Sequence, residues 1–218
     1  MIAMILAAGR GERLRPVTDK LPKALVQVRG ETLLERHLRA LAAFGVDTVV
    51  INLGWLGEAI VERVGSGAGY GLDVVYSPEG EHVLETGGGI RRALPMIGDA
   101  PFLVVNADVY TEMPLPGGEL AAGDLAHLVL VPTPPHRDEG DFDLVGDRVR
   151  NGDRPEFTFA GVALYRPEFF ADCAPGRFPL APLLREAADA GTLSGELYRG
   201  PWDDVGTPER LAALNLAV

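Results

Sequence analysis

Several features are scarce in this sequence of 218 residues, and each scarcity excludes a class of protein. The chain has one cysteine, Cys173, so no disulfide can form within it and a reducing compartment, the cytoplasm, is expected. No apolar run approaches the roughly 18 residues that a membrane helix needs. The apolar start, residues 1–8, lacks the basic flank and small-residue cleavage site of a secretory signal. We therefore expect a cytoplasmic protein without a membrane partner.

Excess positive charge is also absent, because the formal net charge is -11. Nonspecific binding to nucleic acid requires a basic surface, so no nucleic-acid partner is expected. Lysine is rarer still, since 18 of the 20 basic residues are arginine and the two lysines are Lys20 and Lys23. Both lie in residues 10–29, a segment with six basic residues and two acidic ones. This distribution suggests a small anionic ligand held locally, although a solvated run of charges has the same composition.

What the sequence does contain is an alternation of strand and helix patterns. Apolar runs rich in Val, Ile and Leu predict strands buried on both faces, at residues 2–6, 47–52, 72–77 and 101–106. Apolar residues at helical spacing predict helices at residues 32–45, 56–65 and 89–98. Strand followed by helix, repeated, predicts an α/β fold with a doubly wound, mostly parallel, Rossmann-like sheet.

The pattern changes after Pro132. Residues 142–150 predict a hairpin that turns at Gly146 and Asp147, and residues 156–165 predict a further, antiparallel strand. Helices are predicted at residues 180–191 and 208–218. The length and the apolar fraction of 47% favour a single domain over residues 1–218, with two domains as the alternative. Within it, residues 1–132 and 133–218 form two parts of different pattern.

The loop after the first strand, residues 7–22, lies where an α/β sheet binds ligands, beyond the carboxyl ends of its strands. It has neither the spacing of a Walker loop nor the third glycine of a dinucleotide fingerprint, where Leu14 stands. The spacing that it does have is Gly9-x-Gly11-x-Arg13-x-x-Pro16-x-Thr18, followed by Pro22-Lys23.

This spacing resembles that of the sugar-1-phosphate nucleotidylyltransferases, whose fold is of the GT-A-like nucleotidyltransferase type. The resemblance implies that Arg13 and Lys23 are catalytic, with the arginine on the β- and γ-phosphates and the lysine on the reacting phosphates. It also implies that the nucleotide is bound by the loop residues Ala8, Gly9, Gly11, Glu12, Arg13 and Lys23. A lysine ammonium supplies a point charge without a planar fork, which explains a lysine in an arginine-rich chain. Lys20 either shares this role or is solvated surface.

Two groups of carboxylates follow predicted strands. Asn106 and Asp108 come directly after residues 101–106, where an Asn-x-Asp sequence is also common in turns. Asp203 and Asp204 precede the segment 206–208, where Thr207 is a candidate N-cap and where Asp204 could merely shape the turn. Trp-x-Asp-Val-Gly-Thr-Pro closes many members of the family, and its aspartate is a metal ligand. The resemblance therefore implies that Asp108 and Asp204 bind Mg²⁺, or Mn²⁺, and leaves Asp203 solvated.

Three consecutive glycines, Gly87 to Gly89, stand at the head of a predicted helix, where they are unfavourable. Either a flat nucleobase approaches the backbone or the segment is a hinge. Residues 84–89 resemble one subgroup, the N-acetylmuramate α-1-phosphate uridylyltransferases, as do residues 140–144, 159–170, 178–187 and 194–211. This resemblance implies that the nucleobase is bound by Thr86, Gly87 and Gly88, and the sugar phosphate by Asn106, Gly140 and Glu156.

The implied reaction joins UTP and N-acetylmuramic acid 1-phosphate to UDP-N-acetylmuramic acid and pyrophosphate, in peptidoglycan recycling. The attacking phosphate monoester is ionised at neutral pH, since its second pKa is about 6, so the reaction needs no side-chain base. His37 and His82 are therefore expected to be surface or core residues. Without the left-handed β-helix that makes some relatives trimeric, a monomer is expected. Two alternatives stay open: a mannose- or heptose-1-phosphate guanylyltransferase, and a catalytically silent nucleotide-binding regulator.

Overall fold

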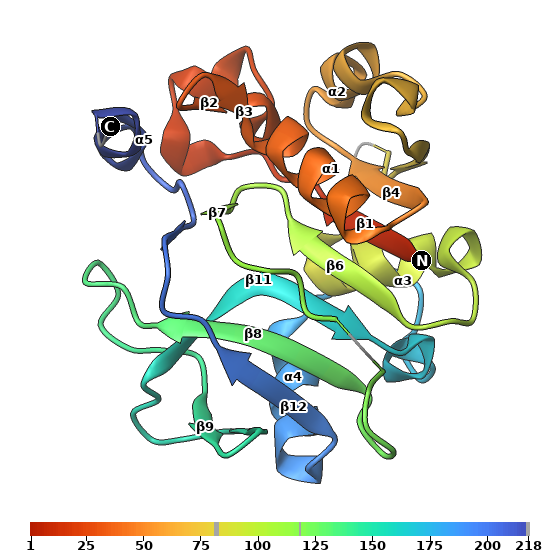
Figure 1. Ribbon diagram of the computed structural model, residues 1–218, viewed down its shortest axis with the longest axis vertical. Helices are drawn as coiled ribbons and strands as arrows, with labels where there is room; N and C mark the ends of the chain where they lie inside the picture. Colours follow the sequence, from red (N-terminus) through yellow and green to blue (C-terminus); the bar gives the residue numbers. More distant parts are fainter. Residues whose placement is uncertain (81–82, 118, 217–218) are drawn as a thin grey trace.

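The computed structural model describes residues 1–80, 83–117 and 119–216. Its centre is a nine-stranded sheet with the order β5-β4-β1-β6-β11-β8-β12-β10-β9 (Figure 1). The strands are β1 (Ile2–Leu6), β4 (Thr48–Leu53), β5 (Asp73–Pro78), β6 (Phe102–Asn106), β8 (Ala126–Pro132), β9 (Asp143–Val145), β10 (Arg148–Arg150), β11 (Phe157–Tyr165) and β12 (Leu193–Leu197). All of them except β10 and β11 point the same way. This confirms the predicted doubly wound, mostly parallel α/β fold.

Two short ribbons stand beside the large sheet. One pairs β2 (Gln27–Val28) with β3 (Glu31–Thr32), and the other pairs β7 (Tyr110–Thr111) with β13 (Trp202–Asp203). The loop after β1 and two later connections contain single 3-10 turns, which are η1 (Glu12–Leu14), η2 (Val17–Asp19), η3 (Lys23–Leu25), η4 (Ala68–Tyr70) and η5 (Pro167–Phe170).

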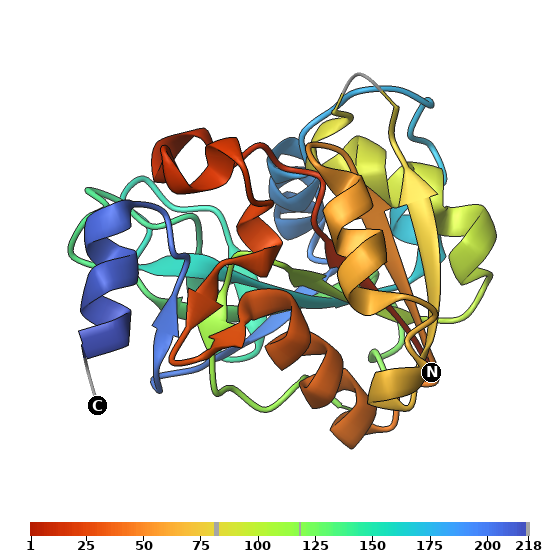
Figure 2. The same cartoon turned by 90° about the horizontal axis from the view of Figure 1, so that it is seen from above.

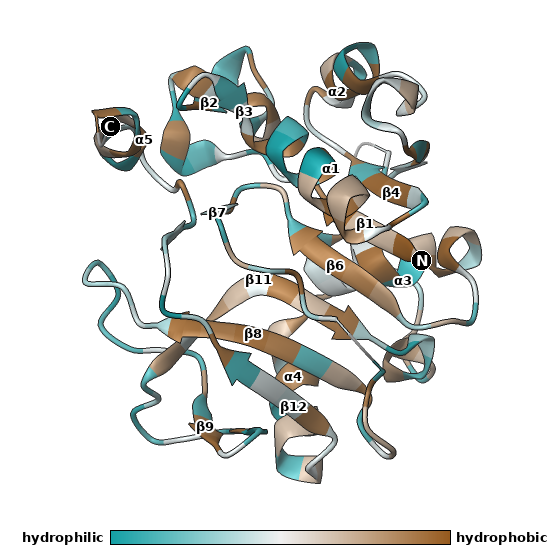
Figure 3. Ribbon diagram, viewed as in Figure 1, coloured by the Kyte–Doolittle hydropathy of each residue, from teal (hydrophilic) through white to brown (hydrophobic). Residues whose placement is uncertain are grey.

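Helices cover both faces of the sheet. The five helices are α1 (Leu33–Phe44), α2 (Gly57–Val64), α3 (Glu85–Ile97), α4 (Ala181–Ala190) and α5 (Pro208–Leu216). Alternate residues of β1 face opposite ways, so that Ile5 packs with α1 and α2 while Met4 packs with α3 and α4. Figure 2 shows α1 and α4 on opposite sides of the sheet, and Figure 3 shows how apolar the strands between them are. The helix α5 lies apart from both layers, beside β2.

The ends of α1 follow from its sequence. Thr32 accepts a hydrogen bond from the backbone N–H of Glu35, whose side chain reaches back to the N–H of Thr32, and the two form a capping box. The helix ends at Gly45, whose φ of 93° is left-handed, as the sequence predicts. Within the described residues, none of the helices has the length and apolar character needed to cross a membrane.

The predicted elements are observed with small shifts at their ends, but there are differences. Helix α3 begins at Glu85 rather than at residue 89, so the three glycines lie inside its first turns. The hairpin at residues 146–147 and the antiparallel β11 are confirmed. Strands β8 and β12 were not among the predicted elements. The predicted helix 208–218 is observed over 208–216, and residues 217–218 lie outside the described residues.

Candidate active site

The loop after β1 folds back on itself and places Lys23 beneath Gly11. Gly11 has a left-handed φ of 62°, and a Cβ on it would lie 2.9 Å from Thr18 Cγ2 and 3.1 Å from Lys23 Cβ. The Thr18 hydroxyl donates a 2.8 Å hydrogen bond to the Gly11 carbonyl. Gly9, by contrast, has open space beside it. The loop therefore needs glycine at position 11 for its fold, while position 9 leaves room for a ligand.

The Lys23 ammonium joins the two acidic segments that the sequence singled out. Its Nζ donates to Asp108 Oδ2 at 2.6 Å and to the backbone carbonyl of Asp204 at 3.2 Å. The Lys23 side chain is only 12% exposed, so its charge is little screened by solvent. Asp108 follows β6 and Asp204 follows β13, and both thus lie beside Lys23 at the carboxyl edge of the sheet.

The ribbon of β7 and β13 holds Asp204 in this position. Trp202 pairs with Thr111 in the ribbon, and its indole Nε1–H donates to the carbonyl of Ala160 in β11 at 2.9 Å. The prediction that Asp203 is solvated is wrong. Asp203 Oδ1 accepts hydrogen bonds from the Arg210 guanidinium and from the backbone N–H of Val205, both at 2.7 Å, which fixes the turn that carries Asp204.

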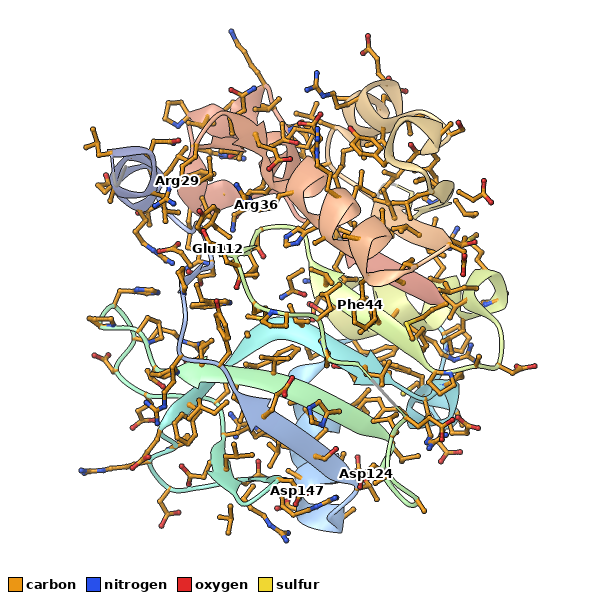
Figure 4. The ribbon with its side chains drawn as sticks, viewed as in Figure 1. Arg29, Arg36, Phe44, Glu112, Asp124 and Asp147 are labelled. Carbon is orange, nitrogen blue, oxygen red and sulfur yellow. The ribbon has the colours of Figure 1, made fainter. Side chains whose placement is uncertain are left out.

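Tyr110 supports the same ribbon from below. Its ring is buried and contacts two guanidinium groups, with Arg29 Cζ 5.4 Å and Arg36 Cζ 4.8 Å from the ring centroid. Figure 4 shows these arginines close together, with Glu112 nearby; the Tyr110 hydroxyl donates to Glu112 Oε1 at 3.3 Å. Two cation–π contacts to one ring stabilise its orientation, and with it the strand two residues beyond Asp108.

A cavity of about 990 Å³ opens at this edge of the sheet. The predicted site residues that line it are Ala8, Gly9, Gly11, Glu12, Arg13, Lys23, Thr86, Asn106 and Asp108. The other five predicted site residues are not among its lining residues: Gly87, Gly88, Gly140, Glu156 and Asp204. Asn52, Glu79, Glu85 and Arg177 also line it, and sequence reasoning missed all four.

The three glycines of α3 are explained by contacts within the protein. A Cβ on Gly87 would lie 2.5 Å from Phe178 Cε2, and one on Gly88 would lie 2.2 Å from the Gly176 carbonyl oxygen. The Gly88 N–H donates to the Phe178 carbonyl at 3.1 Å. A Cβ on Gly89 would lie 2.6 Å from Glu79 Oε1. The close approach expected from sequence is therefore real, and its partners are protein groups; a base contact by Gly87 and Gly88 stays a prediction.

Asn52 and Glu79 form a directed chain of hydrogen bonds along the cavity wall. The Ala7 N–H donates to Asn52 Oδ1 at 2.6 Å, and Asn52 Nδ2 donates to Glu79 Oε1 at 2.7 Å. Glu79 Oε2 accepts from the Leu84 N–H at 2.6 Å. This chain connects the ends of β1, β4 and β5 to the start of α3. No local motif marks these residues, because strand order brings them together.

The predicted sugar-phosphate residues occupy two places. Asn106 lines the cavity, and its amide lies over Gly161 in β11, where a Cβ would come within 2.7 Å of Asn106 Nδ2. Gly140 and Glu156 lie in the loops beside β8 and β11, where the Gly140 N–H donates to the Pro155 carbonyl at 3.0 Å. Glu156 is exposed.

None of the histidines in the described part of the chain is placed as a catalytic base on Lys23 or Asp108. His37 is buried in α1, and burial lowers its pKa from 6.5 to about 4, so it is neutral at physiological pH. His136 Nε2 lies 3.7 Å from Asp204 Oδ1; partial burial, with the nearby Arg210 charge, lowers the pKa of His136. His82 lies outside the described residues.

The donors at the cavity edge suit a hard divalent cation. Across residues 1–80, 83–117 and 119–216 no group of three or more His, Cys, Asp or Glu side chains is arranged to hold a metal ion alone. Asp108 Oδ2 and the backbone carbonyl of Asp204 both contact Lys23 Nζ, so the two aspartates lie beside the same ammonium group. Mg²⁺ is usually held by one or two carboxylates together with substrate phosphates and water, so this pair fits Mg²⁺.

Comparison with known proteins shows that the chain is a nucleotidyltransferase. Residues 3–128 match the MobA-like NTP transferase domain. The N-acetylmuramate α-1-phosphate uridylyltransferase of Neisseria meningitidis serogroup B is 46% identical, covering 97% of this chain and 95% of that protein. The protein of that name from Caulobacter vibrioides is 35% identical over the same shares.

Solved structures agree with the fold. A Bacillus anthracis protein described as a glucose-1-phosphate thymidylyltransferase superposes with a TM-score of 0.85 at 18% identity, over 100% of this chain and 96% of that one. HddC from Yersinia pseudotuberculosis gives a TM-score of 0.78 at 21% identity, over 99% and 98% of the two chains. The chain belongs to the MobA-like NTP transferase family, together with relatives that include the two uridylyltransferases. The resemblance inferred from residues 9–23 and 84–89 is thereby confirmed.

Proposed function

We propose that this enzyme joins UTP and N-acetylmuramic acid 1-phosphate to UDP-N-acetylmuramic acid and pyrophosphate, in the cytoplasm, as a step of peptidoglycan recycling. The observation that carries the proposal is that Lys23 Nζ, in the loop after β1, contacts both the Asp108 carboxylate and the backbone carbonyl of Asp204. The near-complete coverage of the two uridylyltransferases supports the choice of substrates, because it includes the second half of the chain as well as the loop.

The reaction requires charge stabilisation and alignment more than proton transfer. An ionised oxygen of the sugar phosphate attacks the α-phosphorus of UTP in line, and the bond from that phosphorus to the bridging oxygen of the leaving pyrophosphate breaks. Lys23 Nζ would stabilise charge on the α-phosphate, while Arg13 would hold the departing pyrophosphate. When bound by Asp108 and Asp204, Mg²⁺, or Mn²⁺, would neutralise the phosphates that meet there.

The remaining assignments divide the site into two parts. Residues 1–132 would bind the nucleotide, through the backbone of Ala8, Gly9, Gly11 and Glu12 at the phosphates and through Thr86, Gly87 and Gly88 at the uracil. Residues 133–218, with Asn106 from the first part, would bind the sugar phosphate through Gly140 and Glu156. The whole chain would act as one domain and as a monomer.

One substrate experiment tests these assignments. Purified protein is incubated with Mg²⁺ and N-acetylmuramic acid 1-phosphate, each of the four nucleoside triphosphates is offered separately, and pyrophosphate release is measured. Release with UTP alone is expected. Release with GTP, or only with another sugar 1-phosphate, would keep the mechanism and replace the substrates; mannose-1-phosphate guanylyltransferases are among the relatives, at 34% identity over 58% of this chain. No release with any pair would favour a silent nucleotide-binding regulator.

The metal assignment has its own test. Asp204→Asn removes the carboxylate charge but keeps the size and the backbone carbonyl that Lys23 contacts, so turnover should fall by at least about a thousandfold while the fold persists. Circular dichroism and thermal unfolding check the fold, and pyrophosphate release checks the activity. Full activity of this variant would remove Asp204 from the proposed mechanism.

A further inference from the structure

Arg210 forms hydrogen bonds to the turn that carries Asp204, and the proposed mechanism gives Arg210 no role. It lies in the first turn of α5, where its backbone N–H donates to the Thr207 hydroxyl at 3.4 Å. Its guanidinium donates to Asp203 Oδ1 at 2.7 Å and to Asp203 Oδ2 at 3.4 Å. The same group donates to Asp204 Oδ1. With a side chain only 17% exposed, the guanidinium is largely removed from solvent.

Other basic side chains lie near the same aspartate. Two guanidiniums lie beside Gly206, because a Cβ on it would be 2.9 Å from Arg210 Nη1 and 3.7 Å from Arg13 Cζ. Lys23 Nζ binds the Asp204 carbonyl, and His136 Nε2 lies 3.7 Å from Asp204 Oδ1. The carboxylate oxygen assigned to the metal is therefore already neutralised by a basic side chain of the chain itself.

We infer that Arg210 is a positioning residue that competes with the divalent cation for Asp204, so that the cation binds tightly only together with the nucleotide. The inference rests on the metal assignment of the proposed function. A cation at Asp204 Oδ1 faces the fixed positive charge of Arg210 at short range, where a partly buried pair is poorly screened. A nucleoside triphosphate supplies anionic oxygens for both the cation and the guanidinium, which removes the repulsion.

The experiment measures Mn²⁺ affinity without any substrate, from free Mn²⁺ by electron paramagnetic resonance. Arg210→Gln should bind Mn²⁺ at least about tenfold more tightly than the unmodified enzyme, a change of about 1.4 kcal/mol. The matched control is Arg92→Gln, which removes one guanidinium from an exposed position of α3 and should leave the affinity unchanged. Adding Asp204→Asn to Arg210→Gln should remove the gain, because the competition is for that carboxylate.

A purely structural role for Arg210 predicts the opposite result. If the guanidinium only held the turn together, Arg210→Gln would loosen Asp204 and weaken Mn²⁺ binding, and unchanged or weaker binding overturns the inference. Equal tightening by Arg92→Gln would also overturn it, since that would be a general charge effect. The result is separable from the substrate assignment. If Arg210→Gln binds Mn²⁺ more tightly but the unmodified enzyme does not turn over UTP, only the substrates are rejected. If the unmodified enzyme turns over UTP but Arg210→Gln leaves the Mn²⁺ affinity unchanged, only this inference is rejected.

Discussion

The hydrogen bonds from Ala7 to Leu84 have a fixed direction, which allows a sharp prediction. Asn52 cannot reverse its amide, because its oxygen accepts from the Ala7 N–H and its nitrogen donates to Glu79. Both carboxylate oxygens of Glu79 are acceptors, one from Asn52 and one from the Leu84 N–H. Glu79→Gln keeps the shape but must turn its new NH₂ group toward one of these two donors.

The expected loss follows from burial. Asn52 and Glu79 are 3% and 7% exposed, so water cannot replace the lost acceptor. A hydrogen bond to a charged group contributes about 1.5–3 kcal/mol, and a buried donor left unpaired costs about 1–3 kcal/mol. We therefore expect Glu79→Gln to lower the free energy of unfolding by about 3 kcal/mol. Asn52→Asp should be similarly harmful, because it places two carboxylate oxygens against each other.

Combining the two changes should restore the network. With Asn52→Asp and Glu79→Gln together, the new carboxylate accepts from the Ala7 N–H and from the new amide, whose oxygen accepts from the Leu84 N–H. The double variant should recover most of the loss, giving a coupling energy of at least about 2 kcal/mol in a double-mutant cycle. Urea unfolding followed by circular dichroism measures all four proteins, and Glu62→Gln on the exposed face of α2 is the matched control. If Glu79→Gln were as stable as the parent, or if the two losses simply added, the argument from hydrogen-bond direction would be refuted.

Two further predictions concern stability. Gly88→Ala should destabilise the protein by more than about 2 kcal/mol, because its Cβ would lie 2.2 Å from the Gly176 backbone oxygen. The control Gly69→Ala has open space around its Cβ and should change the free energy of unfolding in urea little. Equal effects of the two substitutions would contradict the packing argument. Burial lowers the pKa of the His37 imidazole from 6.5 to about 4, so the free energy of unfolding should fall as the pH drops from about 6.5 to about 4, because the unfolded chain takes up the proton first. The loss is at most about 3 kcal/mol. His37→Gln should flatten this slope in urea titrations at several pH values.

The sequence predicts those parts of the site that are encoded in short segments. Gly11 and Lys23 lie 12 residues apart in one loop, and Asp108 directly follows a buried strand, so local spacing was sufficient to find them. Arg177 and Glu85, which pair at 2.7 Å on the cavity wall, come from distant segments, and neither segment alone indicates the pairing. Their role depends on how the loop before α4 packs on α3, which is a property of tertiary structure.

The glycines of α3 show the same limit more clearly. Three glycines in a row indicate either that something approaches the backbone or that the segment is a hinge. The identity of the approaching group is not local information. Phe178 and Gly176 arrive from the second half of the chain and Glu79 from the end of β5, and only the order of strands in the sheet brings them to the same turn.

The scarcity of lysine has a practical consequence for labelling. Amine-directed reagents meet only two lysine side chains in this chain, and the structure makes them unequal: Lys20 is exposed, whereas Lys23 is largely covered and bound to Asp108. Of the two lysines, Lys20 should therefore react first with a fluorophore ester. The dye would then stand within the loop after β1, three residues from Lys23, without any engineered cysteine. Its emission would report on ligand arrival in real time.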